Sequence, residues 1–374
     1  MATNYFLLPA STGKKAVLWA LVLFACSQVA LTLYLNGKKP EVRDPAFGLR
    51  ILSLKARLAE KPGTPLVLAL GSSRVLNGFS PADMRVRLKQ TGSEPLIYNF
   101  AFAGSGSVRE LMTFRRLRAE GVKPEWMIIE TWPVLWPEDG TFAERRIIEQ
   151  DDLRWTDAPV YLRYMPGKIE LLAKSIKGNL LPLLSYRSRL LHATARVFLP
   201  HKQVTQFDGE YQDWDPFDGT GWLPCHKHPE TPEELWEEVV KGRWYTCPLL
   251  NPLRISANSD KALHDLLDEC RAAGIKVALL LMPEHSECRR WYPPQAQGLV
   301  SSYLSGICKE YGILAFDTRD WSPDEDFADF CHMVRHGARP FSERFAREVM
   351  QPWLNGEPLS REVLLKEPSQ TLLP

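Results

Sequence analysis

The sequence predicts a three-layer α/β/α domain on a five-stranded parallel sheet, preceded by a transmembrane helix and interrupted by a mainly helical or irregular insertion. Three observations support this class. Short, wholly apolar runs alternate with helical patterns, as expected for parallel strands buried on both faces. The alternation stops for about 120 of the 374 residues and then resumes. A long uncharged run near the N-terminus predicts the membrane helix.

Five apolar runs are the expected strands, because each is too short for a buried helix. They are residues 65–70, 95–100, 125–131, 276–282 and 313–317. One helix is expected to start at Ser80 as N-cap with Pro81 in its first turn, and another to end before Gly121. Later helices are expected at residues 259–273, 293–311 and 341–353.

The membrane helix is expected at residues 16–35, which carry no charged side chain. As a helix, this run can cross about 30 Å of hydrocarbon. Trp19 and Tyr34 lie near its ends, where aromatic rings favour the membrane interface. Lysine pairs flank both ends, so the positive-inside rule orients it only weakly. The short N-terminal stub favours a cytoplasmic N-terminus and an extracytoplasmic domain, periplasmic or extracellular.

Two other interpretations of this run stay open. It could be a cleaved signal peptide, although it is longer than a usual apolar signal region. It could be a lipoprotein signal that ends at Cys26, although Phe24 is bulky for that motif. An uncleaved anchor fits the length and the flanks best. The expected domains are a stub (1–15), the anchor (16–35), a tether with a short helix (36–62), the α/β domain (63–132 and 253–356), the insertion (133–252) and a tail (357–374).

Composition excludes several functional classes. Lys plus Arg number 46 against 45 Asp plus Glu, so no global basic field exists to bind nucleic acid. A mean hydropathy of −0.23 excludes a protein with many membrane spans. Gly104-Ser105-Gly106 follows the second expected strand, and Arg109 occupies the position of the third glycine of a dinucleotide loop. No cofactor is therefore expected.

The seven cysteines show no metal-ligand spacing. Cys225 and Cys247 flank a loop-rich stretch and could pair in an oxidising compartment. His226 and His228 follow Cys225, but no second ligand pair accompanies them. No metal site is expected.

Candidate catalytic residues lie where expected strands end, the usual place for function in an open parallel sheet. Ser73 follows the first strand, and Asp329 and His332 lie in the loop before the last helix. A serine hydroxyl needs an imidazole to take its proton and a carboxylate to orient that imidazole. Either motif alone is common, but their joint placement favours a Ser73–His332–Asp329 triad. Cys331 as nucleophile and His336 as base are weaker alternatives.

These blocks resemble the SGNH (GDSL-type) hydrolase superfamily over about residues 65–132 and 255–353. Gly71-Ser72-Ser73 stands at the family's Gly-Asp-Ser block, and Asp329-x-x-His332 at its last block. The resemblance implies a flavodoxin-like sheet and an oxyanion hole formed by the backbone N–H groups of Ser73 and Gly104. The Gly-Ser-Ser variant resembles envelope-associated members, including those involved in D-alanylation of teichoic acids and O-acetylation of exopolysaccharides.

The family's third block, Gly-x-Asn-Asp, has no match here. Glu130-Thr131-Trp132-Pro133 occupies its place, so the asparagine that would donate to the oxyanion is missing. Four side chains at the strand ends are candidates for the substrate pocket, each with a structural role as the alternative: Arg74, Asn99, Trp132 and Glu284. Tryptophans of the insertion could stack on sugar rings or fill a core.

The expected function is that of a membrane-anchored serine esterase or O-acyltransferase that works through an acyl-enzyme. The expected substrate is an acylated cell-envelope glycan or a small ester, and a membrane-bound acyl-donor protein is a candidate partner. The alternative is a catalytically degenerate SGNH-like scaffold in an envelope polysaccharide assembly complex. The missing third-block asparagine favours the alternative, and the intact triad residues favour the enzyme.

Overall fold

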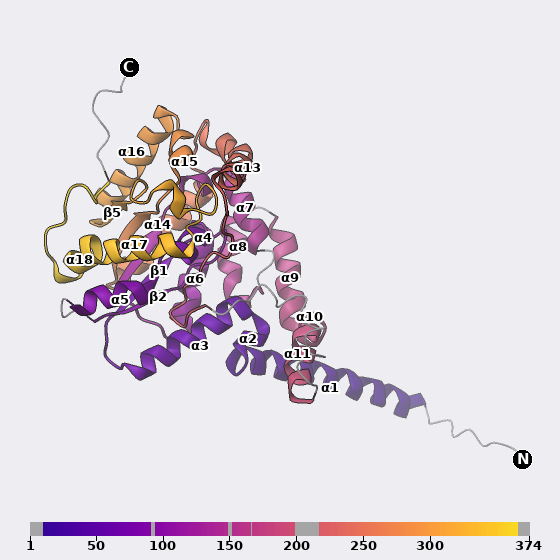
Figure 1. The fold of residues 1–374 in the computed structure, drawn as a ribbon. Helices are drawn as coiled ribbons and strands as arrows, with labels where there is room; N and C mark the ends of the chain where they lie inside the picture. The colour runs from indigo at the N-terminus through magenta and orange to yellow at the C-terminus, as the bar shows by residue number, and fades with distance from the viewer. Residues whose placement is uncertain (1–9, 91–93, 149–151, 166, 199–216, 366–374) are drawn as a thin grey trace, which may run out of the picture. The chain divides into compact units, whose positions relative to one another are not determined.

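The computed structural model describes residues 10–90, 94–148, 152–165, 167–198 and 217–365 (Figure 1). The chain divides into two compact units. The anchor unit comprises Met1–Leu49, Asp152–Ala158 and Ile169–Trp214. The α/β unit comprises Arg50–Asp151, Pro159–Lys168 and Asp215–Pro374.

The α/β unit contains the five-stranded parallel sheet that the sequence predicts. Its strands are β1 (Leu66–Leu70), β2 (Leu96–Asn99), β3 (Trp126–Glu130), β4 (Lys276–Leu281) and β5 (Leu314–Asp317), in the order β2-β1-β3-β4-β5. Along the chain, β1 is followed by β2, which pairs with one edge of β1, and then by β3, which pairs with the opposite edge of β1. The crevice outside the carboxyl ends of β1 and β3 is therefore the switch point where open α/β sheets place their sites.

Helices cover both faces of this sheet, so every residue of β1 is buried. Val67 and Ala69 belong to a core that includes residues of α4 (Ser73–Gly78), α5 (Pro81–Gln90) and α17 (Arg335–Phe345). The alternate residue Leu68 points to the opposite face. On that side α6 (Ser107–Ala119) packs against α14 (Ala257–Ala272), and α16 (Pro294–Tyr311) lies beside β5.

Most helix boundaries agree with the sequence prediction. Gly121, Gly274 and Gly312 follow α6, α14 and α16 with φ between 65° and 82°, the left-handed conformation that glycine adopts without strain. The last helical segment differs. It was expected to begin after Pro340, whereas α17 begins at Arg335 and continues through a π-helical turn (Ala346–Met350) into α18 (Gln351–Asn355).

The described part of the insertion is helical, as the sequence predicts, but it is shared between the two units. It contains η1 (Pro133–Leu135), α7 (Glu138–Ile148), η2 (Trp155–Asp157), α8 (Ala158–Tyr164), α9 (Lys168–Leu180), α10 (Pro182–Ser185), α11 (Arg187–Phe198) and α13 (Pro232–Leu250). Nearly all of α9, with α10 and α11, belongs to the anchor unit. The sequence pattern gives no sign of this division.

The anchor unit begins with α1 (Ala10–Gly37), of which Gly13–Gly37 is long and apolar enough to cross a membrane. α2 (Pro40–Arg43) and α3 (Pro45–Glu60) follow, so the expected tether is largely helical. Within this unit Leu35, Val42 and Tyr186 form a small core. Arg43 is buried and donates to the Asn179 Oδ1 atom at 2.7 Å.

Candidate active site

Ser73, His332 and Asp329 lie together in the α/β unit, although 259 positions separate the serine from the histidine. The Ser73 hydroxyl oxygen is 2.7 Å from His332 Nε2, and His332 Nδ1 is 2.7 Å from Asp329 Oδ2. With the ring proton on Nδ1, His332 donates to Asp329 and accepts from the Ser73 hydroxyl. This is the hydrogen-bond order of a general base beside a serine nucleophile.

Asp329 is held in place by the backbone of its own turn. Its Oδ1 atom accepts hydrogen bonds from the N–H groups of Cys331 at 2.9 Å and of His332 at 2.8 Å. Burial opposes its charge, but the His332 imidazole and these backbone donors outweigh burial and lower the pKa of Asp329 to about 2. The carboxyl group is therefore ionised at neutral pH and can stabilise a cationic His332.

Ser73, the candidate nucleophile, begins a short helix directly after β1. Ser72 is the N-cap of α4, and its hydroxyl accepts a hydrogen bond from the Arg74 N–H at 3.2 Å. Ser73 is the first helical residue and is only partly buried, and its hydroxyl points to His332. Ser72 thus caps the helix, and Ser73 carries the hydroxyl of the candidate nucleophile.

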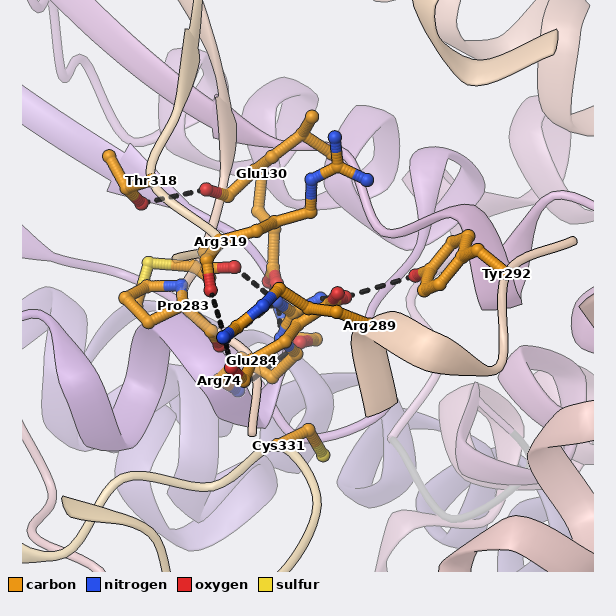
Figure 2. Close-up of polar contacts among 12 residues, drawn as sticks. Arg74, Glu130, Pro283, Glu284, Arg289, Tyr292, Thr318, Arg319 and Cys331 are labelled. Atoms are coloured by element: carbon orange, nitrogen blue, oxygen red, sulfur yellow. Dashed lines mark hydrogen bonds and ion pairs between the residues drawn. The ribbon is translucent and has the colours of Figure 1, made fainter. Parts of the chain in front are cut away.

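Arg74 points inward from residues 71–74, which we call the nucleophile turn, and is surrounded by acceptors (Figure 2). Its guanidinium donates to the backbone oxygens of Met282 at 2.5 Å and Pro283 at 3.2 Å. The carboxylates of Glu284 at 3.3 Å and Glu130 at 3.5 Å complete its surroundings. Burial opposes the charge, yet these two carboxylates raise the pKa of Arg74. One buried cation thus ties the end of β3 and the residues after β4 to the nucleophile turn.

Two other pocket candidates are also interior residues. Asn99 donates to the backbone oxygens of Val75 and Phe79, each at 2.8 Å. Glu284 accepts from the Tyr292 hydroxyl at 3.0 Å, besides its ion pair with Arg74 (Figure 2). Both side chains are fully buried. The structure therefore places Asn99, Glu284 and Arg74 in the interior, where their polar contacts support the segments around Ser73.

The loop that carries Gly104 lies beside the nucleophile turn. The Phe102 N–H donates to the Gly71 oxygen at 3.0 Å, which joins the two loops. Gly104 is partly exposed and has a φ of 63°, a conformation that few other residues adopt. This is the position at which the sequence resemblance expects an oxyanion donor.

Glu144, which the sequence analysis did not single out, secures this second loop from α7. Its Oε1 atom accepts from the N–H groups of Gly106 at 2.9 Å and Arg109 at 2.7 Å, at the start of α6. Burial raises the pKa of Glu144 to about 7, against the lowering effect of these bonds. No sequence signal pointed to it, because its partners lie 35 and 38 positions away.

Trp132 lies just beyond β3, in the segment that the sequence resemblance compares with the third block of the SGNH family. The Arg74 guanidinium lies 5.1 Å from the centre of its ring, a cation–π contact. Its indole N–H is buried and has no hydrogen-bond partner among the described residues. A buried donor of this kind is costly unless a ligand or water satisfies it. Trp132 is therefore a pocket candidate whose indole N–H could bind a ligand or water.

Helix α13 of the insertion packs against the loop that carries Asp329 and His332. A Cβ atom on Gly242 would lie 2.1 Å from the Phe330 ring, so only glycine permits this approach. The Tyr245 ring lies 5.7 Å from that of Phe330, and Tyr245 is still 61% exposed. The Trp291 ring also contacts Phe330, at 5.4 Å. The insertion thus adds an aromatic edge next to the triad, which the tryptophan content alone did not locate.

One group of side chains in the described residues could hold a metal ion, and it overlaps the triad. Donor atoms of Asp329, Cys331 and His332 lie within 4.8 Å of one another. Burial raises the pKa of the Cys331 thiol well above its ordinary value, which disfavours the thiolate that a metal would need. The Asp329–His332 hydrogen bond already uses the facing atoms. Elsewhere, Cys225 and Cys247 are free thiols.

Comparison with known proteins adds no assignment to this geometry. No model of a known protein family matches the chain, and no curated protein matches it.

Proposed function

We propose that this protein is a membrane-anchored serine esterase or O-acyltransferase of the SGNH type that works through an acyl-enzyme. The single observation that carries the proposal is the continuous Ser73–His332–Asp329 hydrogen-bond chain, with both links at 2.7 Å. Such a chain supplies a nucleophile, a general base and an orienting carboxylate at one place. Its position at the switch point of the sheet supports the same assignment.

The reaction would proceed in two balanced halves. Ser73 attacks the acyl carbonyl while His332 Nε2 takes the hydroxyl proton, and that proton then passes to the departing alcohol. The acyl group remains on Ser73 as an ester. Water or a second hydroxyl next attacks this ester, again losing its proton to His332, and Ser73 is released with its own proton restored. Asp329, ionised at neutral pH, stabilises the imidazolium in both halves.

The tetrahedral oxygen needs donors, and the absent asparagine leaves a gap in the family pattern. The Ser73 and Gly104 backbone N–H groups are the first two candidates. The Trp132 indole N–H is the third, because it is buried and has no partner among the described residues. An indole donor at this position would compensate for the missing asparagine.

The proposed substrate class is an acylated cell-envelope glycan. The apolar α1 would keep the enzyme at the membrane, with the α/β unit extracytoplasmic. The exposed Tyr245 and its neighbour Trp244 offer aromatic faces of the kind that stack on sugar rings. A membrane-bound acyl donor would be needed for transfer, whereas hydrolysis needs only water.

Labelling with a fluorophosphonate tests the nucleophile. The full-length protein in detergent should be labelled on Ser73, and both Ser73→Ala and His332→Ala should reduce the rate by at least about a thousandfold. Ser302→Ala and His336→Ala are matched controls, since both residues are exposed, and they should label like the wild type. Labelling that survives Ser73→Ala would refute the assignment.

The second candidate is a catalytically degenerate scaffold, which the replacement of the third-block asparagine by Trp132 favours. A properly folded wild-type protein that is neither labelled nor able to hydrolyse 4-nitrophenyl acetate would support it.

The hydrolase and the transferase differ in the second half of the reaction. Mass increase of an added glycan acceptor identifies transfer, and release of free acid identifies hydrolysis.

A further inference from the structure

Two polar side chains inside the apolar run of helix α1, Gln28 and Thr32, bind other helices of the anchor unit. Gln28 is only 5% exposed, whereas α1 is exposed along most of its described length. The Gln28 Oε1 atom accepts from the Leu183 N–H at 3.3 Å, and the Thr32 hydroxyl donates to the Asn179 oxygen at 2.8 Å. The turn from α9 to α10 is thus attached to the side of the expected membrane helix.

This turn is exposed and strongly apolar. Leu180, Leu183 and Leu184 are 55%, 53% and 49% exposed, and Leu191 of α11 is 57% exposed. Between these residues and α1 lies an open groove of about 650 Å³, lined almost wholly by apolar groups that include Phe24. A patch of large apolar side chains of this kind on a protein surface marks an interaction site.

The point of attachment fixes the depth of the turn relative to α1. The apolar run of α1 ends at Leu35, before Lys38 and Lys39. Gln28 lies seven residues earlier, which is roughly 10 Å along a helix. If α1 crosses a bilayer, Leu183 lies at about that depth below the end of the span. Lipid, and not water, would then surround the leucines.

We infer that residues 169–198 form a second membrane element, whose leucine turn enters the leaflet at the carboxyl end of α1 and whose groove takes lipid acyl chains. Interfacial helices reach a comparable depth of about 5–10 Å. This inference goes beyond catalysis and rests on α1 being a membrane span. It does not depend on Ser73 being a nucleophile.

The N–H groups of the turn meet the donor half of the strictest requirement for entering a bilayer, which is that backbone polar groups be satisfied internally. The Leu181 N–H donates to Lys177, and the Leu184 and Ser185 N–H groups donate to Leu181. Pro182 has no N–H, and the Leu183 N–H donates to Gln28. Each amide N–H of the turn from 181 to 185 is therefore bound.

The charges near the turn fit a lipid surface. Lys177 precedes the leucines and Arg187 follows them, and both side chains are exposed. Long basic side chains at such positions extend toward phosphate groups while their stems stay in the apolar region. The apolar turn flanked by basic residues favours phospholipid over a protein partner as the occupant.

Photo-crosslinking tests this directly with the full-length chain in vesicles of phosphatidylethanolamine and phosphatidylglycerol. p-Benzoylphenylalanine would replace Leu184, or Leu23 of α1 as the positive reference, or Ser302 of α16 as the reference outside lipid. All three positions are exposed. We expect phospholipid adducts by mass spectrometry at positions 23 and 184, and none at 302. Thermal unfolding of each protein shows that the replacement preserves the fold.

The crosslinking results test three points separately: α1 as a membrane span, the leucine turn as a second membrane element, and lipid as the occupant of the groove. An adduct at 23 without one at 184 would overturn the second membrane element. The absence of a lipid adduct at position 23 would show that α1 is not a membrane span, and the second membrane element would then be refuted too. Fluorophosphonate labelling of Ser73 would be unaffected by that result. Crosslinking of position 184 to a protein in native membranes, in place of lipid, would overturn lipid as the occupant.

Discussion

Gly71 and Glu130 pack so closely that a Cβ atom on Gly71 would lie 2.7 Å from both the Cβ and the Oε2 atom of Glu130. The same Oε2 atom accepts a hydrogen bond from the Ser72 N–H at 2.6 Å. The absence of a side chain at Gly71 therefore allows β3 to hold the nucleophile turn of β1. The glycine before the serine pair has a packing role here, besides any role toward substrate.

Gly71→Ala should displace Glu130 and loosen the nucleophile turn. We expect a loss of roughly 1–3 kcal/mol of unfolding free energy, typical of overpacking, and slower fluorophosphonate labelling of Ser73. Gly298→Ala is the matched control, because its new methyl group meets nothing within 4 Å in α16. That variant should be neutral or more stable by about 0.5–1 kcal/mol. Equal effects of the two changes in urea unfolding would contradict the packing role.

Glu130→Gln should destabilise the protein, because it leaves the buried Arg74 with Glu284 as its only carboxylate partner among the described residues. Breaking a buried ion pair typically costs about 3–5 kcal/mol. Glu343→Gln weakens partly exposed ion pairs with Arg87 and Arg339 and should cost less than about 1 kcal/mol. Urea unfolding compares the two, and a similar small cost in both would show that Arg74 does not need Glu130.

Asp329→Asn should leave the fold intact and reduce turnover of 4-nitrophenyl acetate by about ten thousandfold, because the imidazole loses its orienting acceptor.

The pKa of Asp329 falls from 3.8 to about 2 on folding. The unfolded chain thus binds more protons between these values, so this carboxylate stabilises the fold above pH 3.8, and that stability is lost as the pH falls toward 2. Urea unfolding across this range should show a shallower pH dependence in Asp329→Asn.

Trp132→Phe keeps the ring but removes the indole N–H. If that N–H binds the tetrahedral oxygen, acyl-enzyme formation should slow by about a hundredfold or more, with little change in unfolding free energy. Trp236→Phe removes the indole N–H of an exposed tryptophan on α13 and should leave the acylation rate unchanged. Rapid-mixing measurement of 4-nitrophenol release gives both rates. An unaffected Trp132→Phe rate would assign the oxyanion to other donors.

Glu144 should make the protein less stable as the pH rises from about 4.5 to 7. Burial raises its pKa from 4.5 to about 7, so the folded state binds the extra proton over this range. Stability then falls by up to about 1.4 kcal/mol per pH unit. Glu144→Gln keeps an oxygen for the Gly106 and Arg109 N–H groups and should flatten this slope. Glu357→Gln, at an exposed site, should keep the wild-type slope.

The sequence predicts the sheet and the triad residues because both leave local signals. Apolar runs marked the strands, and the spacing of Asp329 and His332 within one turn suggested their pairing. The supporting interactions left no such signal, because they join distant segments. Arg74 could be predicted as a salt-bridge residue, but not its partners in β3 and after β4, since many carboxylates compete for that role. The attachment of α10 to Gln28 was equally hidden, because the insertion has no strand pattern to place it.

The hydrogen bond between Gln28 and Leu183 joins groups 155 positions apart, and this separation affects the order in which the protein is made. At about 5–20 residues per second, α1 would leave the ribosome on the order of ten seconds before the helices that bind it. During that interval the Gln28 amide has no partner from α10. Strands β1 to β3 are also complete before those helices, whereas β4 and β5 follow them. The anchor unit therefore has to wait for helices that are made after β1 to β3, but its chain is complete before β4 is made. In simple N-to-C order the anchor unit can finish folding first, and the α/β unit finishes only after β5 is made.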